Sequence, residues 1–220
     1  MTDFYSAVFF DMDGLLVDSE PQWLIAETEL MADFEYRWTT ADQNYCLGGP
    51  LTRVGQYMFE KSGKKESPEF FTRSVVERMT QKLSAGAPVL PGALELLQEL
   101  KSSAIPTALV SASPRVLVDA VLNSLENHTF EFSISADDVK NTKPDPEAYL
   151  KAADILGVDI SNCLILEDSP TGVKAATSSG ASVIAVPHFV EIEPKERLRV
   201  ISSLTELNFK NLHSSYAQDK

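Results

Sequence analysis

Short runs of consecutive apolar residues alternate with longer segments of helical periodicity along most of this chain. The apolar runs lie at 7–10, 107–110, 164–166 and 182–186, with a weaker one at 130–135. Runs of this length that are apolar on both faces are typical of parallel strands covered by helices. The segments 92–102, 114–125, 146–156 and 170–179 begin near a proline or a small residue, as helices often do. The pattern predicts an α/β fold with a Rossmann-like parallel sheet.

The segment 19–87 interrupts this alternation. It carries two amphipathic patterns, at 20–34 and 69–83, and no convincing central strand. Such a segment is too long for a simple connection between a strand and the next helix of a compact domain. We therefore expect an inserted all-α helical cap at 19–87 and a catalytic core made of residues 1–18 and 88–220.

The composition is that of an ordinary globular protein, since 44% of the 220 residues are hydrophobic and 23% are charged. The net charge of −13 argues against nucleic acid as a partner, because phosphate backbones require a basic face. No apolar run approaches the roughly 20 residues of a membrane span, and no signal peptide is recognisable. Cys46 and Cys163 give no disulfide framework. We expect a cytoplasmic monomer that binds neither nucleic acid nor membrane.

The first apolar run ends on Asp11 and Asp13, which are followed by Gly14. Residues two apart in an extended segment point the same way, so both carboxylates are expected in the crevice where open α/β sheets bind ligands. Two carboxylates this close repel each other, and a cation or a proton must lie between them. The pattern suits Mg²⁺ together with a nucleophilic aspartate, while the alternative is an acidic turn after a strand.

Three further segments carry polar groups in positions that suit the same chemistry. Ser111, Ala112 and Ser113 follow the second apolar run, Lys143 lies in a proline-bounded turn, and Glu167 and Asp168 end the run at 164–166. Taken singly, each has a plain alternative. The serines suit a helix N-cap, the lysine suits an exposed turn, and the two acids suit a helix N-terminus.

Asp-x-Asp, Ser, Lys-Pro and Glu-Asp, in this order, resemble the four motifs of the haloacid dehalogenase-like (HAD) phosphotransferase superfamily. The resemblance extends from about residue 8 to residue 186. It implies the HAD fold, a helical cap between the first and second motifs, Mg²⁺ as cofactor and a small phosphorylated metabolite as partner.

The resemblance also assigns a role to each motif residue. Asp11 would be the nucleophile that forms an aspartyl-phosphate, and Asp13 would be the general acid and base. Ser111 would donate a hydrogen bond to the phosphoryl group, and Lys143 would supply positive charge. The implied phosphate-binding set is Asp11, Met12, Asp13, Ser111, Ala112, Ser113 and Lys143. The implied metal set is Asp11, Asp13 (through its carbonyl), Asp168 and Glu167, the last binding or orienting a metal-bound water.

Asp13 favours phosphoryl transfer, because the haloacid dehalogenases themselves lack this acid. The chain most resembles sugar-phosphate phosphatases such as 2-deoxyglucose-6-phosphatase, and β-phosphoglucomutase. The mutases carry a histidine where this chain has Trp23. We therefore predict a Mg²⁺-dependent phosphatase of small phosphorylated metabolites, with sugar phosphates as the expected class. A β-phosphoglucomutase-like enzyme and a non-catalytic metabolite-binding or regulatory protein are the alternatives.

Three cap residues are further candidates for substrate contact. The segment 47–53 resembles a substrate loop that closes over the site. Arg53 and Arg73 would meet a sugar hydroxyl or a distal phosphate, with simple solvation as the alternative. Trp23 would be a platform for the sugar, with packing inside the cap as the alternative.

Overall fold

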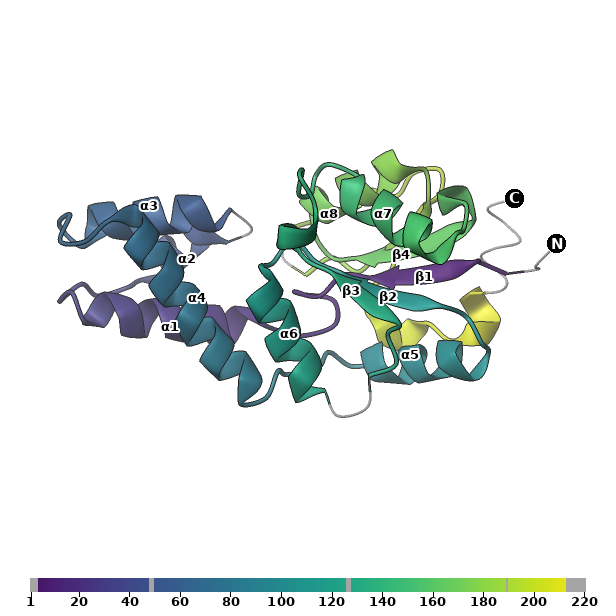
Figure 1. The fold of residues 1–220 in the computed structure, drawn as a ribbon, viewed down its shortest axis with the longest axis horizontal. Coiled ribbons are helices and arrows are strands. Elements are labelled where there is room, and N and C mark those ends of the chain that lie inside the picture. The colour runs from purple at the N-terminus through teal and green to yellow at the C-terminus, as the bar shows by residue number, and fades with distance from the viewer. Residues whose placement is uncertain (1–3, 48–49, 126–127, 189, 213–220) are drawn as a thin grey trace.

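A six-stranded parallel sheet forms the centre of the protein (Figure 1). The computed structural model describes residues 4–47, 50–125, 128–188 and 190–212. The strand order is β3-β2-β1-β4-β5-β6, so β1 lies between β2 and β4. The strands are β1 Ala7–Phe10, β2 Thr107–Val110, β3 Phe132–Ile134, β4 Cys163–Glu167, β5 Ser182–Ala185 and β6 Leu198–Val200. The predicted α/β fold with a parallel sheet is confirmed.

Both faces of the sheet are apolar and covered by helices. Val8 and Phe10 belong to one buried cluster, and Ala7 and Phe9 belong to the other, as the alternation of side chains in a strand requires. In Figure 1, α7 and α8 cover one face and α5 lies against the opposite face. The core helices are α5 Ala93–Ser102, α6 Arg115–Ser124, α7 Glu147–Leu156 and α8 Pro170–Ser179, with 3₁₀ turns at Ala136–Asp138, Ile160–Asn162 and Leu204–Glu206.

Four helices that precede α5 lie together at one end of the molecule, away from the sheet (Figure 1). They are α1 Glu20–Ala32, α2 Thr40–Cys46, α3 Leu51–Lys61 and α4 Pro68–Ser84, and we call them the cap. The amphipathic patterns at 20–34 and 69–83 correspond to α1 and α4. The exact domain boundaries at 18/19 and 87/88 stay a prediction.

Helices α2 and α3 and strand β6 were not predicted individually. For α2 and β6 there is a physical reason. Helix α2 has seven mostly polar residues and is held by a capping box, in which Thr39 and Asp42 bind each other's backbone N–H groups. Strand β6 has only three residues at the sheet edge, one of them buried. Neither element is long enough to show a hydrophobic period.

Two further observations concern the cysteines and the lengths of the helices. Cys46 and Cys163 are buried free thiols. Within the described ranges, none of the helices combines the length and the apolar character that crossing a bilayer requires.

Candidate active site

The carboxyl ends of three neighbouring strands bring the predicted motifs together. Phe10 of β1 is in register with Leu109 of β2 and with Leu166 of β4, and the backbone N–H of Asp11 donates to Leu166 O at 3.0 Å. The sequence order turns back between β1 and β4, which is where doubly wound sheets bind their ligands. The residues that follow these strands therefore face one crevice.

Lys143 connects the nucleophile candidate to the acidic end of β4. Its Nζ donates to Asp11 Oδ1 at 2.5 Å and to Glu167 Oε1 at 2.7 Å, and also to the carbonyl oxygen of Val110 at 2.9 Å. Only 4% of the lysine side chain is exposed. Burial lowers the pKa of this ammonium, but the two carboxylates outweigh burial and raise it. Lys143 is thus a charged group of the site, and the simple exposed-turn alternative is wrong.

Three carboxylates lie close enough together to bind one metal ion. Asp11, Glu167 and Asp168 each offer an oxygen, and these oxygens lie within 4.8 Å of one another. Burial raises the pKa of Asp11 to about 7 against the opposing charge of Lys143, and burial with the charge of Asp11 raises the pKa of Asp168 to about 9. When all three acids are ionised, the single ammonium of Lys143 leaves two negative charges uncompensated, and a divalent cation would balance them. The all-oxygen donor set fits Mg²⁺.

Two glycines make room for these carboxylates. Gly14 has a φ of +80°, and a Cβ there would lie 2.2 Å from Asp168 Oδ2. A Cβ on Gly172 would lie 1.9–2.0 Å from the carboxylate of Glu167. Both distances are far inside van der Waals contact, so the acids occupy their positions only because these side chains are missing.

Asp13 is held by two hydroxyl groups from different parts of the chain. Ser19 Oγ donates to Asp13 Oδ1 at 2.6 Å, and Ser113 Oγ donates to Asp13 Oδ2 at 2.7 Å. The turn between Asp13 and Ser19 is closed by the backbone N–H of Gly14, which donates to Val17 O at 2.9 Å. The acid is therefore fixed from both sides beside the crevice.

The segment after β2 forms a compact serine turn. Ser111 is buried, and its Oγ accepts a hydrogen bond from the backbone N–H of Ser113 at 3.0 Å. Ser113 was predicted to belong to the phosphate-binding set, but its backbone N–H is already hydrogen-bonded to Ser111 Oγ. Ala112 is exposed, whereas the Met12 side chain is fully buried.

The three candidate residues for substrate contact in the cap, Arg53, Arg73 and Trp23, each contact other residues of the protein. Arg53 lies in the first turns of α3, and its Nη2 donates to three carbonyl oxygens at the end of α2: Tyr45 at 2.9 Å, Cys46 at 3.4 Å and Leu47 at 3.4 Å. The Arg73 side chain is 68% exposed and is 3.7 Å from Glu77. Trp23 is partly buried against the apolar core. Residues 48–49 of the expected substrate loop lie outside the described residues.

Sequence reasoning missed several polar residues near the site. Ser19 binds Asp13, and the Tyr149 hydroxyl donates to Glu167 Oε1 at 2.6 Å. Burial, together with Asp13 and Asp18, raises the pKa of Glu20 to about 7. The only sequence signal was their placement: Ser19 and Glu20 directly follow the first motif, and Tyr149 lies one turn into the helix after Lys143.

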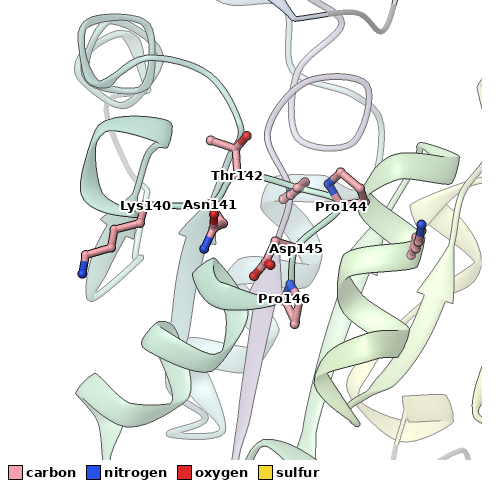
Figure 2. Close-up of a pocket in the computed structure, with 8 residues that line it drawn as sticks. Lys140, Asn141, Thr142, Pro144, Asp145 and Pro146 are labelled. Atoms are coloured by element: carbon pink, nitrogen blue, oxygen red, sulfur yellow. The ribbon is translucent and has the colours of Figure 1, made fainter.

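A surface hollow of about 570 Å³ lies beside the Lys143 loop (Figure 2). Figure 2 shows that residues from Lys140 to Pro146 form most of its lining, and Lys174 of α8 completes it. None of the three clustered carboxylates lines this hollow. Lys143 itself lines the hollow, but its ammonium is hydrogen-bonded to Asp11 and Glu167.

Among the curated proteins that resemble this chain are two phosphatases. One matches nearly the whole chain, and the other matches most of it. Hexitol phosphatase B of Escherichia coli (strain K12) is 33% identical in an alignment of 220 positions that covers 94% of this chain and 96% of the relative. The phosphorylated carbohydrates phosphatase of Thermotoga maritima is 33% identical over 175 residues, which cover 79% of this chain and 81% of the relative.

Solved structures and the family profile extend this likeness. The crystal structure of β-phosphoglucomutase from Clostridium difficile superposes with a TM-score of 0.80 over 98% of both chains at 24% identity, which shows a shared fold. The profile of the haloacid dehalogenase-like hydrolases matches residues 8–186, the span that the four motifs predicted. The chain therefore belongs to the haloacid dehalogenase-like hydrolase family.

Proposed function

We propose that this protein is a Mg²⁺-dependent phosphatase of small phosphorylated metabolites, with sugar phosphates as its substrate class. The observation that carries the proposal is the joint placement of Asp11, Lys143 and two further carboxylates at the ends of β1 and β4. The phosphatase names of the two relatives support the reaction class and the sugar phosphates.

The first chemical step transfers the phosphoryl group to Asp11. An Asp11 carboxylate oxygen attacks phosphorus, and the bond between phosphorus and the ester oxygen breaks. Asp13 gives its proton to the leaving alkoxide. Among the described residues, hydrogen bonds reach Asp11 only at Oδ1, which leaves Oδ2 for the attack.

The second step returns Asp11 to its starting state. Asp13, now deprotonated, takes a proton from a water molecule that attacks phosphorus, and the bond to Asp11 breaks. Inorganic phosphate leaves, and Asp13 is again protonated. Ser19 and Ser113 hold the Asp13 carboxyl in one place for both proton transfers.

Charge neutralisation is divided between the protein and the metal. Lys143 supplies positive charge beside Asp11, and Ser111, buried directly after β2, is proposed to donate its hydroxyl to a phosphoryl oxygen. Asp11, Asp168 and the Asp13 carbonyl would hold Mg²⁺, and Glu167 would orient a water bound to it. When bound, Mg²⁺ supplies Lewis-acid stabilisation of the phosphoryl oxygens.

The cap is proposed to select the substrate. Glu20 begins α1 next to Asp13, which places a hydrogen-bond acceptor for a sugar hydroxyl near the leaving group. Trp23 and Arg53 remain candidates for substrate contact. The contacts of Trp23 favour packing, and those of Arg53 favour capping of α2. Arg73, exposed on α4, is the weakest of the three candidates.

A phosphosugar mutase is the second candidate, because β-phosphoglucomutase shares the fold. The two reactions differ in the acceptor of the phosphoryl group, which is water in a phosphatase and a second sugar phosphate in a mutase. Incubation with β-glucose 1-phosphate and a bisphosphate primer separates them. Free phosphate supports the phosphatase, and glucose 6-phosphate supports the mutase. A non-catalytic binding role is disfavoured because every motif residue is present.

The test of the proposal is phosphate release from a panel of sugar and hexitol phosphates, with and without EDTA. We expect release that requires Mg²⁺ and that disappears in Asp11→Asn. Asp154→Asn, an exposed aspartate of α7, is the matched control and should retain full activity. Absence of metal-dependent release from every compound would refute the proposal.

A further inference from the structure

Tyr149 has a hydroxyl that packing alone does not explain. Tyr149 belongs to α7, and its ring is fully buried. It lies in the same apolar cluster as Ala148, Ala152 and Ala153, on the face of the sheet that α7 covers. A phenylalanine would fill the same apolar space. The hydroxyl instead reaches the end of β4, where it donates to Glu167 Oε1 at 2.6 Å. A buried hydroxyl needs such a partner, so this position is built for the contact.

Glu167 depends on a small number of donors. Its side chain is 0% exposed, so a donor that is lost cannot be replaced by bulk water. Oε1 accepts from Lys143 and Tyr149, while Oε2 accepts from the backbone N–H of Asp168 at 3.1 Å and from Ser169 Oγ at 3.4 Å. The shortest of these four hydrogen bonds is the one from Tyr149.

Lys143 cannot keep all three of its acceptors while it also donates to a phosphoryl group. Its three hydrogens are already divided among Asp11, Glu167 and the carbonyl of Val110. To donate to a phosphoryl oxygen, the ammonium must release one of these acceptors. Because the Tyr149 hydroxyl also donates to Glu167 Oε1, this oxygen keeps a hydrogen-bond donor whichever acceptor Lys143 releases. Its ring also lies 4.9 Å from Lys143 Nζ, so the same side chain borders both members of the ion pair.

We infer that Tyr149 is a positioning residue, whose hydroxyl fixes Glu167 and thereby sets the affinity of the acidic cluster for Mg²⁺. The inference rests on the proposed function, because it assigns Mg²⁺ to that cluster. Groups that orient metal-binding side chains typically change metal affinity or activity by about 10- to 100-fold when they are removed.

The experiment is a calorimetric titration of the substrate-free protein with Mg²⁺, comparing wild type with Tyr149→Phe. We expect the dissociation constant to rise about tenfold in the variant. Tyr57→Phe is the matched control, because its hydroxyl also donates to a carboxylate, that of Asp42 in the cap at 2.8 Å. The control should bind Mg²⁺ within about twofold of wild type.

Activity provides a second readout. In Tyr149→Phe, we expect the Mg²⁺ concentration for half-maximal phosphate release to rise in parallel, with the KM for the sugar phosphate unchanged. Thermal unfolding by circular dichroism verifies the fold. If the phenylalanine variant does not fold, Tyr149→Met fills the apolar site without a donor and replaces it.

Equal Mg²⁺ affinity in wild type and Tyr149→Phe would overturn the inference, as would an equal loss in Tyr57→Phe or a wild type that does not bind Mg²⁺. The proposed function is judged separately. Weakened Mg²⁺ binding in the variant, together with no phosphate release by wild type, would refute the phosphatase alone. Mg²⁺-dependent release that the variant leaves unchanged would refute the role of Tyr149 alone.

Discussion

Glu27 is an acid inside the cap whose burial should make the stability of the protein depend on pH. It lies on the inner face of α1, is 2% exposed, and its Oε2 has no hydrogen-bond partner among the described residues. Burial first, and then the nearby Glu20, raise the pKa of Glu27 from 4.5 to about 8, while the indole N–H of Trp38 opposes them. We choose Glu27→Gln as the perturbation, because it keeps the shape and removes the titration.

The direction of the pH dependence follows from the number of protons that the folded and unfolded states bind. Between the unfolded pKa of 4.5 and the folded pKa of about 8, the folded state holds a proton that the unfolded state has released. This contribution to stability is therefore fully present below about pH 4.5 and is lost as the pH rises through about 8. Each pH unit in this window corresponds to about 1.4 kcal/mol. From about pH 5 to pH 7.5, the free energy of unfolding of wild type should fall by about 3 kcal/mol relative to Glu27→Gln.

The assay is urea unfolding followed by tryptophan fluorescence at a series of pH values. Both tryptophans, Trp23 and Trp38, lie in the cap, so the signal reports the part of the protein that contains Glu27. Glu66→Gln, an exposed acid of the cap, is the control and should follow wild type at every pH. A difference between Glu27→Gln and wild type that stays constant from about pH 5 to pH 8 would show that Glu27 titrates normally and that the reasoning is wrong.

Three further substitutions test the geometry. Gly172→Ala should displace the Glu167 carboxylate and lower phosphate release about 10- to 100-fold, whereas near-normal turnover would mean that the carboxylate has room to move. Asp13→Asn with p-nitrophenyl phosphate, whose leaving group needs no proton, should give a burst of one nitrophenolate per enzyme followed by slow turnover; steady turnover without a burst contradicts the role of base. Arg53→Ala should destabilise the cap by about 1 kcal/mol in urea unfolding and leave KM within twofold, because the guanidinium caps α2. A large rise in KM at unchanged stability would assign Arg53 to the substrate instead.

The placement of the motif residues was predictable because it depends on local rules. A buried parallel strand is recognised from its apolar run, and its carboxyl end fixes where the next residues point. Asp11, Ser111 and Asp168 each follow such a run within two residues. Lys143 is different, because no strand precedes it directly, and only the order of the motifs indicated its position.

The partners of these residues were not predictable from the sequence. Tyr149 meets Glu167 across 18 residues, and Ser113 meets Asp13 across 100. Such contacts depend on how α7 and the turn after β2 pack against the sheet, which has no local signature. The burial of Glu27 is even harder to predict, since the pattern of hydrophobic and polar residues assigns a charged residue to the exposed face of a helix.

A few residues link Asp13, the proposed general acid and base, to the cap. Val17, which precedes the cap, and Val89, which follows it, pair side by side as an antiparallel bridge. Ser19 lies directly after this bridge and donates to Asp13, and α1 begins with the very next residue, Glu20. A rotation of the cap about the bridge therefore changes the direction of α1 and moves the Ser19 hydroxyl at the same time. If the cap closes over a substrate by such a rotation, we expect the hydrogen bond from Ser19 to Asp13 to change with it, so that the proposed proton transfers by Asp13 depend on the position of the cap.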